Sequence, residues 1–365
     1  MSSYLAQADL GKEKSIMKKT SILFVVLVMA VLLSGVFILG PQTASAKKPV
    51  LLRDVVPSPP GDYPLTFMND ELAKRFNKRA KGEYVMEVHA GGALAKLPEY
   101  FDAVRIGAVE MACAPWGMYS FLDPRLGIIE TPFLFTTSTG ASAACKHLLP
   151  LYDQILQEKF NAKGLNLYNP GGIHIFSTKP VKTLEDVKGL LAGAISPPTA
   201  ALIKELGGSP VTIMWTDQYE ALQKKVIDAV TQGTHGALVM GLMDVCKHAT
   251  IFFGLAGWNG FSINLDVWNK MPKHIQQILQ EEATKAGEWM NEIVDTKVGK
   301  EDVKKFKEMG VEVYILPKGE RDRWENEVAP YKKKQLESFG EFGQKVKKIA
   351  DDMNKRYPYS EQGLY

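Results

Sequence analysis

Cysteine is scarce in this sequence: the 365 residues contain only three, which excludes a fold held together by disulfides. Neither sign of charge dominates, because 44 basic residues stand against 41 acidic ones and the formal net charge is +3. A balance this close to neutral gives no general attraction to nucleic acid. No H-E-x-x-H, G-x-S-x-G, Walker or G-x-G-x-x-G motif occurs, so the common signatures of hydrolases and nucleotide-binding enzymes are missing.

Metal-binding patterns are absent as well. Cys113, Cys145 and Cys246 are too far apart for a C-x-x-C pair, and we interpret them as small apolar core residues. The six histidines are scattered, and none has a partner at helical or hairpin spacing. We therefore expect no metal, no cofactor and no catalytic residue.

The N-terminal segment differs from the rest of the chain. Met17-Lys18-Lys19 precedes an apolar stretch that reaches Gly40, and Ala44-Ser45-Ala46 has the small-residue spacing of a cleavage site. This pattern predicts a secretory signal peptide over residues 1–46 and a periplasmic product; because the apolar stretch is long, an uncleaved anchor is the alternative. Met17 is a second candidate for the start of translation. Cleavage would remove four lysines and two acidic residues, leaving 319 residues with a net charge of +1.

The remaining chain has an ordinary globular composition, with 45% hydrophobic and 23% charged residues in the whole sequence, and it is long enough for two lobes. Short apolar runs alternate with amphipathic helices, which predicts α/β lobes with largely parallel sheets. Leu51–Val56 and Tyr84–His89 have the pattern of strands, and Leu65–Arg79 between them has the pattern of a helix.

One segment recurs 118 positions further along the chain. Phe101-Asp102-Ala103-Val104 leads into Ala108–Ala112, and Tyr219-Glu220-Ala221-Leu222 leads into Val226–Val230. Both copies are predicted to form a short helix, a tight turn and a strand. Chance similarity is one explanation, and two similarly wound lobes that face each other are the other.

Ligands in open α/β sheets bind at the carboxyl ends of strands. The two-lobe interpretation therefore predicts a cleft lined by Cys113–Trp116 from one lobe and Thr231–His235 from the other. A long helix after Pro272, with an apolar stripe as far as Ile293, is placed to brace both lobes. Glu320–Arg356 is predicted to be helical, with its charges on a solvated face.

Seven short motifs follow one another between residues 50 and 300. They are Gly91–Leu94, Gly107–Met111, Thr131–Phe135, Lys179–Val181 with Leu184–Gly189, Leu206–Val211, Tyr219–Gln223 with Val226–Asp228, and Ile263-Asn264 with Trp268–Pro272. Each motif alone is weak, but in this order they resemble the periplasmic solute-binding subunit of a TRAP (tripartite ATP-independent periplasmic) transporter, the DctP-like family.

The resemblance implies a monomer with a two-lobed periplasmic-binding-protein-like fold that closes on a small organic solute, usually an acid. The loaded protein would then dock on the TRAP membrane permease subunits, and nucleic acid is not an expected partner. Lobe I would comprise residues 47–170, 258–298 and 326–365, and lobe II residues 171–257 and 299–325.

One position departs from the family pattern. Members normally carry an arginine after the Lys-Gly pair that clamps the carboxylate of the solute, but Gly193 stands at its place in this sequence. A charge-assisted pair with arginine is worth about 1.5–3 kcal/mol, and glycine cannot replace it. We therefore expect malate and succinate to bind more weakly than about 100 μM. The solute would be neutral or aromatic, a cation enclosed by aromatic rings, or an anion held by His174 and backbone N–H groups.

The candidate ligand-binding residues are Trp116, Tyr119, His174, Gly193, Trp215, Gln232 and His235. Trp116 and Tyr119 follow the first repeated strand. The resemblance places Trp215 where members set an aromatic ring against the solute, Gln232 where many have an asparagine, and His174 at a basic position of some members. Core packing is the alternative for both tryptophans, and a structural role is the alternative for His174.

Two other functions stay open at this point. A periplasmic enzyme would use Cys113 or His174 in the cleft, and a ligand-presenting partner of a sensor kinase would use the same fold. A solute receptor is the favoured hypothesis, because the chain carries an export signal and lacks catalytic signatures.

Overall fold

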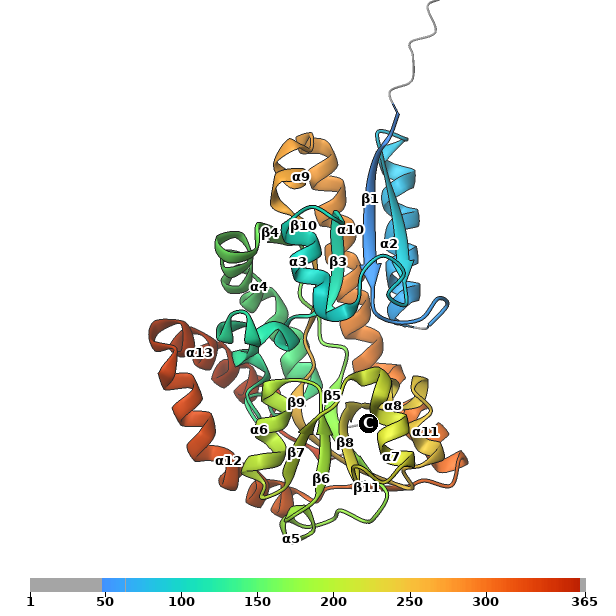
Figure 1. The fold of residues 1–365 in the computed structure, drawn as a ribbon. Coiled ribbons are helices and arrows are strands. Elements are labelled where there is room, and N and C mark those ends of the chain that lie inside the picture. Colours follow the sequence, from blue (N-terminus) through green and yellow to red (C-terminus); the bar gives the residue numbers. More distant parts are fainter. Residues whose placement is uncertain (1–47, 63, 362–365) are drawn as a thin grey trace, which may run out of the picture. The chain divides into compact units, whose positions relative to one another are not determined.

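The computed structural model describes residues 48–62 and 64–361, and the predicted signal peptide lies outside them. The strands are β1 (Val50–Val56), β2 (Tyr84–Ala90), β3 (Met111–Pro115), β4 (Ala162–Gly164), β5 (Gly172–Ser177), β6 (Leu191–Ala194), β7 (Ser209–Thr212), β8 (Ala229–Gly233), β9 (His248–Ala256), β10 (Asn259–Asn264) and β11 (Glu312–Ile315). They form a five-stranded sheet, ordered β2-β1-β3-β10-β4, and a six-stranded sheet, ordered β11-β9-β5-β8-β6-β7 (Figure 1).

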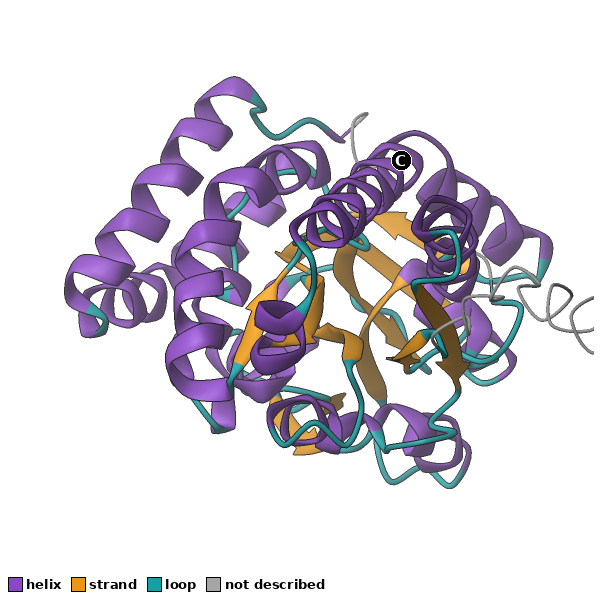
Figure 2. Cartoon of the chain, turned by 90° about the horizontal axis from the view of Figure 1, so that it is seen from above, coloured by secondary structure: helices purple, strands orange, loops and turns teal. Residues whose placement is uncertain are grey.

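Helices lie outside the strands, which occupy the interior (Figure 2). The α-helices are α2 (Leu65–Ala80), α3 (Tyr100–Arg105), α4 (Ser138–Phe160), α5 (Leu184–Val187), α6 (Pro197–Glu205), α7 (Gln218–Gln223), α8 (Thr234–Val239), α9 (Leu265–Lys270), α10 (Lys273–Ile293), α11 (Gly299–Glu308), α12 (Lys318–Ser338) and α13 (Gly340–Arg356). Shorter 3₁₀ segments are η1 (Leu97–Glu99), η2 (Trp116–Phe121), η3 (Pro124–Glu130), η4 (Trp215–Asp217) and η5 (Leu242–Asp244), and η6 (Val294–Val298) is a π-helical turn. None of the helices in the described ranges is long and apolar enough to cross a membrane.

The expectation of largely parallel sheets is wrong, because both sheets are mixed. β10 runs antiparallel to β3 and β4, and β5 runs antiparallel to β8 and β9. The reason is the path of the chain, which leaves β4 of one sheet for β5 of the other and returns from β9 to β10. A strand that enters from the other sheet is not bound by the parallel crossover of a βαβ unit, so it can pair in the opposite direction.

The repeated segment has the same structure in both copies. α3 and α7 each span six residues, and the strands that follow them, β3 and β8, each span five. Corresponding elements are separated by the predicted 118 positions, since α3 begins at Tyr100 and α7 at Gln218. One copy belongs to the five-stranded sheet and the other to the six-stranded sheet.

The predicted long helix is α10, which packs against α2 through a buried stripe of apolar side chains. It continues through η6 into α11, which packs against α8 and β11 beside the six-stranded sheet. The continuous helical segment α10–η6–α11 therefore packs beside both sheets, as expected. The helix predicted over Glu320–Arg356 is instead two helices, α12 and α13, because Gly340, the first residue of α13, has a left-handed backbone with φ of 52°.

Candidate ligand-binding site

A cavity of about 140 Å³ lies between elements of the two sheets. Pro57, Pro115, Ile195 and Gly233 line it, and each lies at or just after the carboxyl end of a strand, β1, β3, β6 or β8. Further walls come from η3, from the starts of α6 and α8, and from the end of α10 with η6. The cavity therefore occupies the place where open α/β sheets bind their ligands.

Equivalent positions of the repeat meet in this cavity. Leu97 begins η1, Trp215 begins η4, and both residues line the wall. Pro115 and Gly233 are the last residues of β3 and β8, and they line it too. The two copies of the repeat thus contribute corresponding surfaces to one site, which favours the interpretation of two similarly wound lobes over chance similarity.

The structure brings three of the seven predicted residues to the cavity wall, namely Trp215, Gln232 and His235. The other four lie elsewhere: Trp116, Tyr119, His174 and Gly193 do not line it. All seven stay predictions as ligand-binding residues, and the four outside the wall have the structural environments described next.

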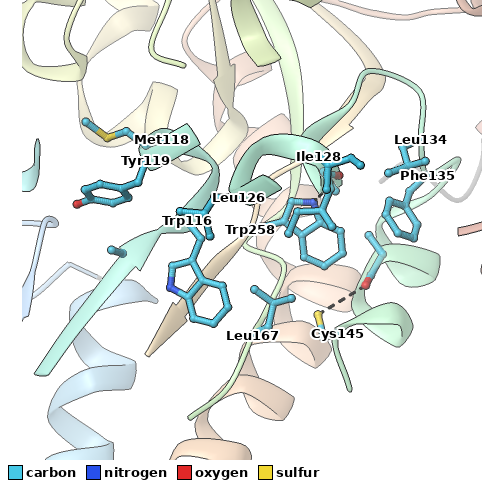
Figure 3. Close-up of a cluster of buried hydrophobic side chains, with 14 of the residues drawn as sticks. Trp116, Met118, Tyr119, Leu126, Ile128, Leu134, Phe135, Cys145, Leu167 and Trp258 are labelled. Atoms are coloured by element: carbon cyan, nitrogen blue, oxygen red, sulfur yellow. Dashed lines mark hydrogen bonds between the residues drawn. The ribbon is translucent and has the colours of Figure 1, made fainter. Parts of the chain in front are cut away.

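Trp116 and Tyr119 belong to the hydrophobic core around η2. Both are fully buried, in a cluster that also contains Leu126, Leu167 and Trp258 (Figure 3). The Tyr119 ring stacks on that of Phe101, with 4.0 Å between ring centroids, and its hydroxyl donates a hydrogen bond to the Leu97 carbonyl. Core packing, the alternative that the sequence left open for Trp116, describes its surroundings in the structure.

His174 fills an irregularity between two strands. The register of β5 with β9 shifts between Ile173 and Ile175, and the His174 Nδ1 accepts hydrogen bonds from the backbone N–H groups of Phe252 and Phe253, at 3.2 and 3.3 Å. Complete burial lowers the pKa of His174 to about 3, so the ring is neutral at physiological pH. A neutral ring that satisfies backbone donors cannot replace the missing arginine as a cation.

Gly193 lies inside the six-stranded sheet. A Cβ atom on this residue would lie 3.0 Å from Ile227 Cδ1 and 3.2 Å from Val230 Cγ1, which are core atoms rather than cavity atoms. Glycine at this position therefore leaves room for Ile227 and Val230, and a larger side chain would have to displace them before it reached the cavity.

Trp215 and Gln232 are two of the polar residues on a wall that also carries many apolar side chains. The Trp215 Nε1 is buried and has no hydrogen-bond partner in the described part of the chain. The Gln232 side chain is satisfied locally, because its Oε1 accepts from the Gly233 N–H at 3.0 Å and its Nε2 donates to Gln218 Oε1 at 3.4 Å. Trp215 is thus the free donor of this pair, and a ligand with an acceptor atom would satisfy it.

His235 connects the two halves of the site. Its Nε2 lies 3.0 Å from Asp62 Oδ1 in the loop after β1, and its Nδ1 lies 3.8 Å from Asp302 Oδ1 on α11. Burial by itself would lower the pKa of His235, but the hydrogen bonds and charges of Asp302 and Asp62 outweigh it and raise the pKa to about 9. An imidazolium held between two carboxylates therefore ties the five-stranded sheet to the six-stranded one at neutral pH.

Asp62→Asn is expected to lower the free energy of unfolding by about 1–2 kcal/mol at pH 6, since it removes one charged hydrogen-bond partner of His235. The folded-state pKa of His235 is raised above its ordinary value of 6.5, so the contribution is complete below pH 6.5 and is lost as the pH rises through about 9. Urea unfolding at pH 6 and pH 9.5 measures both effects. The control is Asp351→Asn, at an exposed aspartate on α13, and an Asp62→Asn deficit that is equal at both pH values would contradict the assignment.

Glu130 is the residue of this cavity that sequence reasoning missed. It ends η3, lines the cavity, and is 6% exposed. Burial raises the pKa of Glu130 to about 8, and the Ser196 hydroxyl, which lowers that pKa, offsets only part of the effect. The only signal in the sequence was its position directly before the motif Thr131–Phe135.

Among the described residues, no lysine or arginine lines the cavity, and the basic side chain of the wall is His235. The ionisable groups that line the cavity are the Glu130 carboxyl and the His235 ring, and Asp62 and Asp302 flank that ring. A carboxylate clamp of the kind that the resemblance implied is therefore missing from the wall, in agreement with the glycine at position 193.

Comparison with known proteins assigns the family. The family described as "Bacterial extracellular solute-binding protein, family 7" matches residues 59–338, more than half of the sequence. The chain belongs to this family. The predicted resemblance to TRAP solute receptors and the predicted two-sheet α/β fold are thereby confirmed.

Two curated periplasmic binding proteins resemble this chain at modest identity. The 2,3-diketo-L-gulonate-binding periplasmic protein YiaO of Escherichia coli (strain K12) is 26% identical over 254 residues, which cover 66% of this chain and 75% of the relative. The C4-dicarboxylate-binding periplasmic protein DctP of Rhodobacter capsulatus is 24% identical over 279 residues, covering 74% of this chain and 81% of the relative.

A solved structure of a family-7-like receptor has the same fold. The extracytoplasmic solute receptor of Bordetella pertussis that binds pyroglutamic acid aligns with a TM-score of 0.77 at 20% identity, over 83% of this chain and 99% of that one. At this identity the likeness concerns the fold alone.

Proposed function

We propose that this family-7 protein is the periplasmic receptor of a TRAP transporter, a monomer that captures one small organic solute by hinge closure and delivers it to the membrane permease subunits. The observation that carries the proposal is the cavity at the carboxyl ends of strands from both sheets. The relatives named above are binding proteins found in the periplasm, which supports the same role and export through residues 1–46.

Hinge closure is supported by the way the chain passes between the sheets. It passes between the sheets after β4, after β9 and at η6, and a fourth connection between the lobes defined below runs through α12. The first two segments are joined by a hydrogen bond from Gly257 N to Gly171 O, at 2.9 Å. Few, adjacent connections are typical of hinges. Our lobes are residues 47–170, 258–298 and 326–365 for one, and 171–257 and 299–325 for the other.

A receptor fits the site better than an enzyme does. Cys113 is buried outside the cavity, its Sγ lies 3.0 Å from the Tyr168 hydroxyl, and burial raises the pKa of its thiol to about 12. A thiol of this kind is no nucleophile at neutral pH. His174, the other group that an enzyme was expected to use, is likewise buried outside the cavity.

Small-angle scattering tests the proposal. A solute that raises the melting temperature is expected to reduce the radius of gyration, because a ligand shifts a two-state equilibrium only by binding the closed form better. The measurement compares the protein with and without that solute. A scattering profile unchanged by a stabilising solute would contradict closure.

A further inference from the structure

We propose that the cavity takes a small organic cation, an amine on an apolar body, and that the carboxylate of Glu130 is its anchor. The inference rests on the proposed receptor function, because it names the class of solute for the same site. A cationic solute bound by a carboxylate is the reverse of the acid bound by an arginine in the family pattern.

Glu130 occupies a niche that is shaped for its carboxyl group. A Cβ atom on Gly117 of η2 would lie 2.0 Å from Glu130 Cδ, so the carboxyl fits only because residue 117 is glycine. The niche opens on the cavity, since Glu130 is among its lining residues although the side chain is almost completely buried. The carboxyl is therefore fixed by packing, as expected of a group that orients a ligand.

Glu130 differs from comparable glutamates of the protein in having no basic partner. The buried Glu282 is held by Arg79 at 2.7 Å, and the partly buried Glu110 is held by Arg53 at 2.7 Å. No ion pair joins Glu130 to a lysine, an arginine or a histidine within residues 48–62 and 64–361. A buried carboxylate without a counter-charge is unfavourable, and a cationic ligand would supply the missing partner.

The rest of the wall suits the body of such a ligand. Trp215, Trp258, Met118 and Met290 offer rings and thioethers, which attract organic cations by cation–π and dispersion contacts. The Nε1 of Trp215 has no hydrogen-bond acceptor among the described residues, so we expect the amine also to carry a carbonyl or hydroxyl group that accepts from it. Asp62 and Asp302 neutralise the charge of His235, so no uncompensated positive charge is available to bind a carboxylate ligand.

Binding of a cation to Glu130 is coupled to loss of a proton. Burial raises the pKa of the free carboxyl to about 8, so at pH 7 it carries its proton. A cation favours the ionised form, and on binding at pH 7 about 0.9 protons would leave for the buffer. A ligand acceptor bound to the protonated carboxyl would instead release none, and its affinity would fall above pH 8.

Of the titratable groups around the cavity, Glu130 is the one expected to release a proton at pH 7, because its neighbours keep their protonation state at this pH. Tyr152 on α4 interacts with Glu130, and burial raises its pKa well above the usual range, so it stays neutral. The start of α6 contributes only the hydroxyl groups of Ser196 and Thr199 to the cavity. His235, across the cavity, has a pKa of about 9 and stays protonated at pH 7.

The test is a thermal-shift library of matched amines and carboxylic acids on the same carbon frames, including succinate and malate, followed by calorimetry of the hits. We expect amines to stabilise the protein and the acids to have little effect. Titration at pH 7 in phosphate and in Tris, which differ in ionisation enthalpy, is expected to show release of close to one proton. Glu130→Gln is expected to abolish that release and to weaken amine binding about 10- to 100-fold, while Glu341→Gln, on the exposed face of α13, changes neither.

Four results would each contradict one part of the proposal. Stabilisation and closure by acids would overturn the cationic solute while the receptor function stands. Amine binding that is unchanged in Glu130→Gln, without proton release, would overturn the anchor, and so would a library in which no amine stabilises the protein. A stabilising amine that releases a proton but leaves the scattering profile unchanged would support the anchor and contradict the proposed closure.

Discussion

Glu130→Gln is expected to raise the free energy of unfolding by on the order of 4 kcal/mol at pH 8, although it removes a residue of the cavity wall. The pKa of Glu130 is raised from an ordinary 4.5 to about 8 by burial. In the unfolded chain the carboxyl loses its proton near pH 4.5, whereas in the folded protein it keeps it until about pH 8. The native protein therefore loses stability through this group as the pH rises from 4.5 to 8, and glutamine, which has no proton to lose, avoids the loss.

Urea unfolding of both proteins at pH 4.5 and pH 8 in the absence of ligand measures this difference. We expect a gap that is small at pH 4.5 and fully developed at pH 8, and Glu341→Gln is the control for a surface glutamate. A gap independent of pH would mean that the carboxyl is not the cause. A residue that lowers the stability of the free protein but stabilises the complex with a ligand is characteristic of a functional site.

The fold could be predicted from sequence because local patterns determine its elements. The stripe of Met68, Leu72 and Phe76 on α2 is buried as its helical spacing required, and the repeat at 118 positions matches α3–β3 and α7–β8. The direction of β5 and β10 could not be predicted, because it depends on how the chain crosses between the sheets. No local pattern records such a crossing.

The site could be predicted only in part, because burial depends on residues far apart in the sequence. Gln232 is the next-to-last residue of β8 and His235 comes just after that strand, whose carboxyl end faces the cavity. The rule that ligands bind at such strand ends was available from the sequence. Glu130 ends an irregular 3₁₀ segment, and its niche exists because Gly117, thirteen positions earlier, has no side chain. Neither the hydrophobic periodicity nor the motif spacing of the sequence indicates the contact between Gly117 and Glu130.

Two tryptophans with the same predicted role are expected to behave oppositely when truncated. Trp116→Ala should lower the free energy of unfolding by about 3–5 kcal/mol, because the indole is fully buried and packs 6.1 Å from the Tyr152 ring centroid. Trp215→Ala should cost about 1 kcal/mol or less, because the side chain is half-buried at the cavity wall.

Binding should follow the reverse order. A solute found by thermal shift should bind Trp215→Ala about tenfold more weakly or worse, through loss of ring contact and of the Nε1 donor, and bind folded Trp116→Ala nearly as well as the unsubstituted protein. Trp116→Phe keeps the core aromatic, so affinity can be measured even if alanine prevents folding. The two tryptophans differ because they lie in different places. Trp116, directly after β3, packs against Gly260, and a Cβ atom on Gly260 would lie 2.4 Å from the Trp116 ring. Trp215 begins η4 at the cavity. Loss of solute affinity in Trp116→Phe with Trp215→Ala unaffected would reverse the assignment of the two rings.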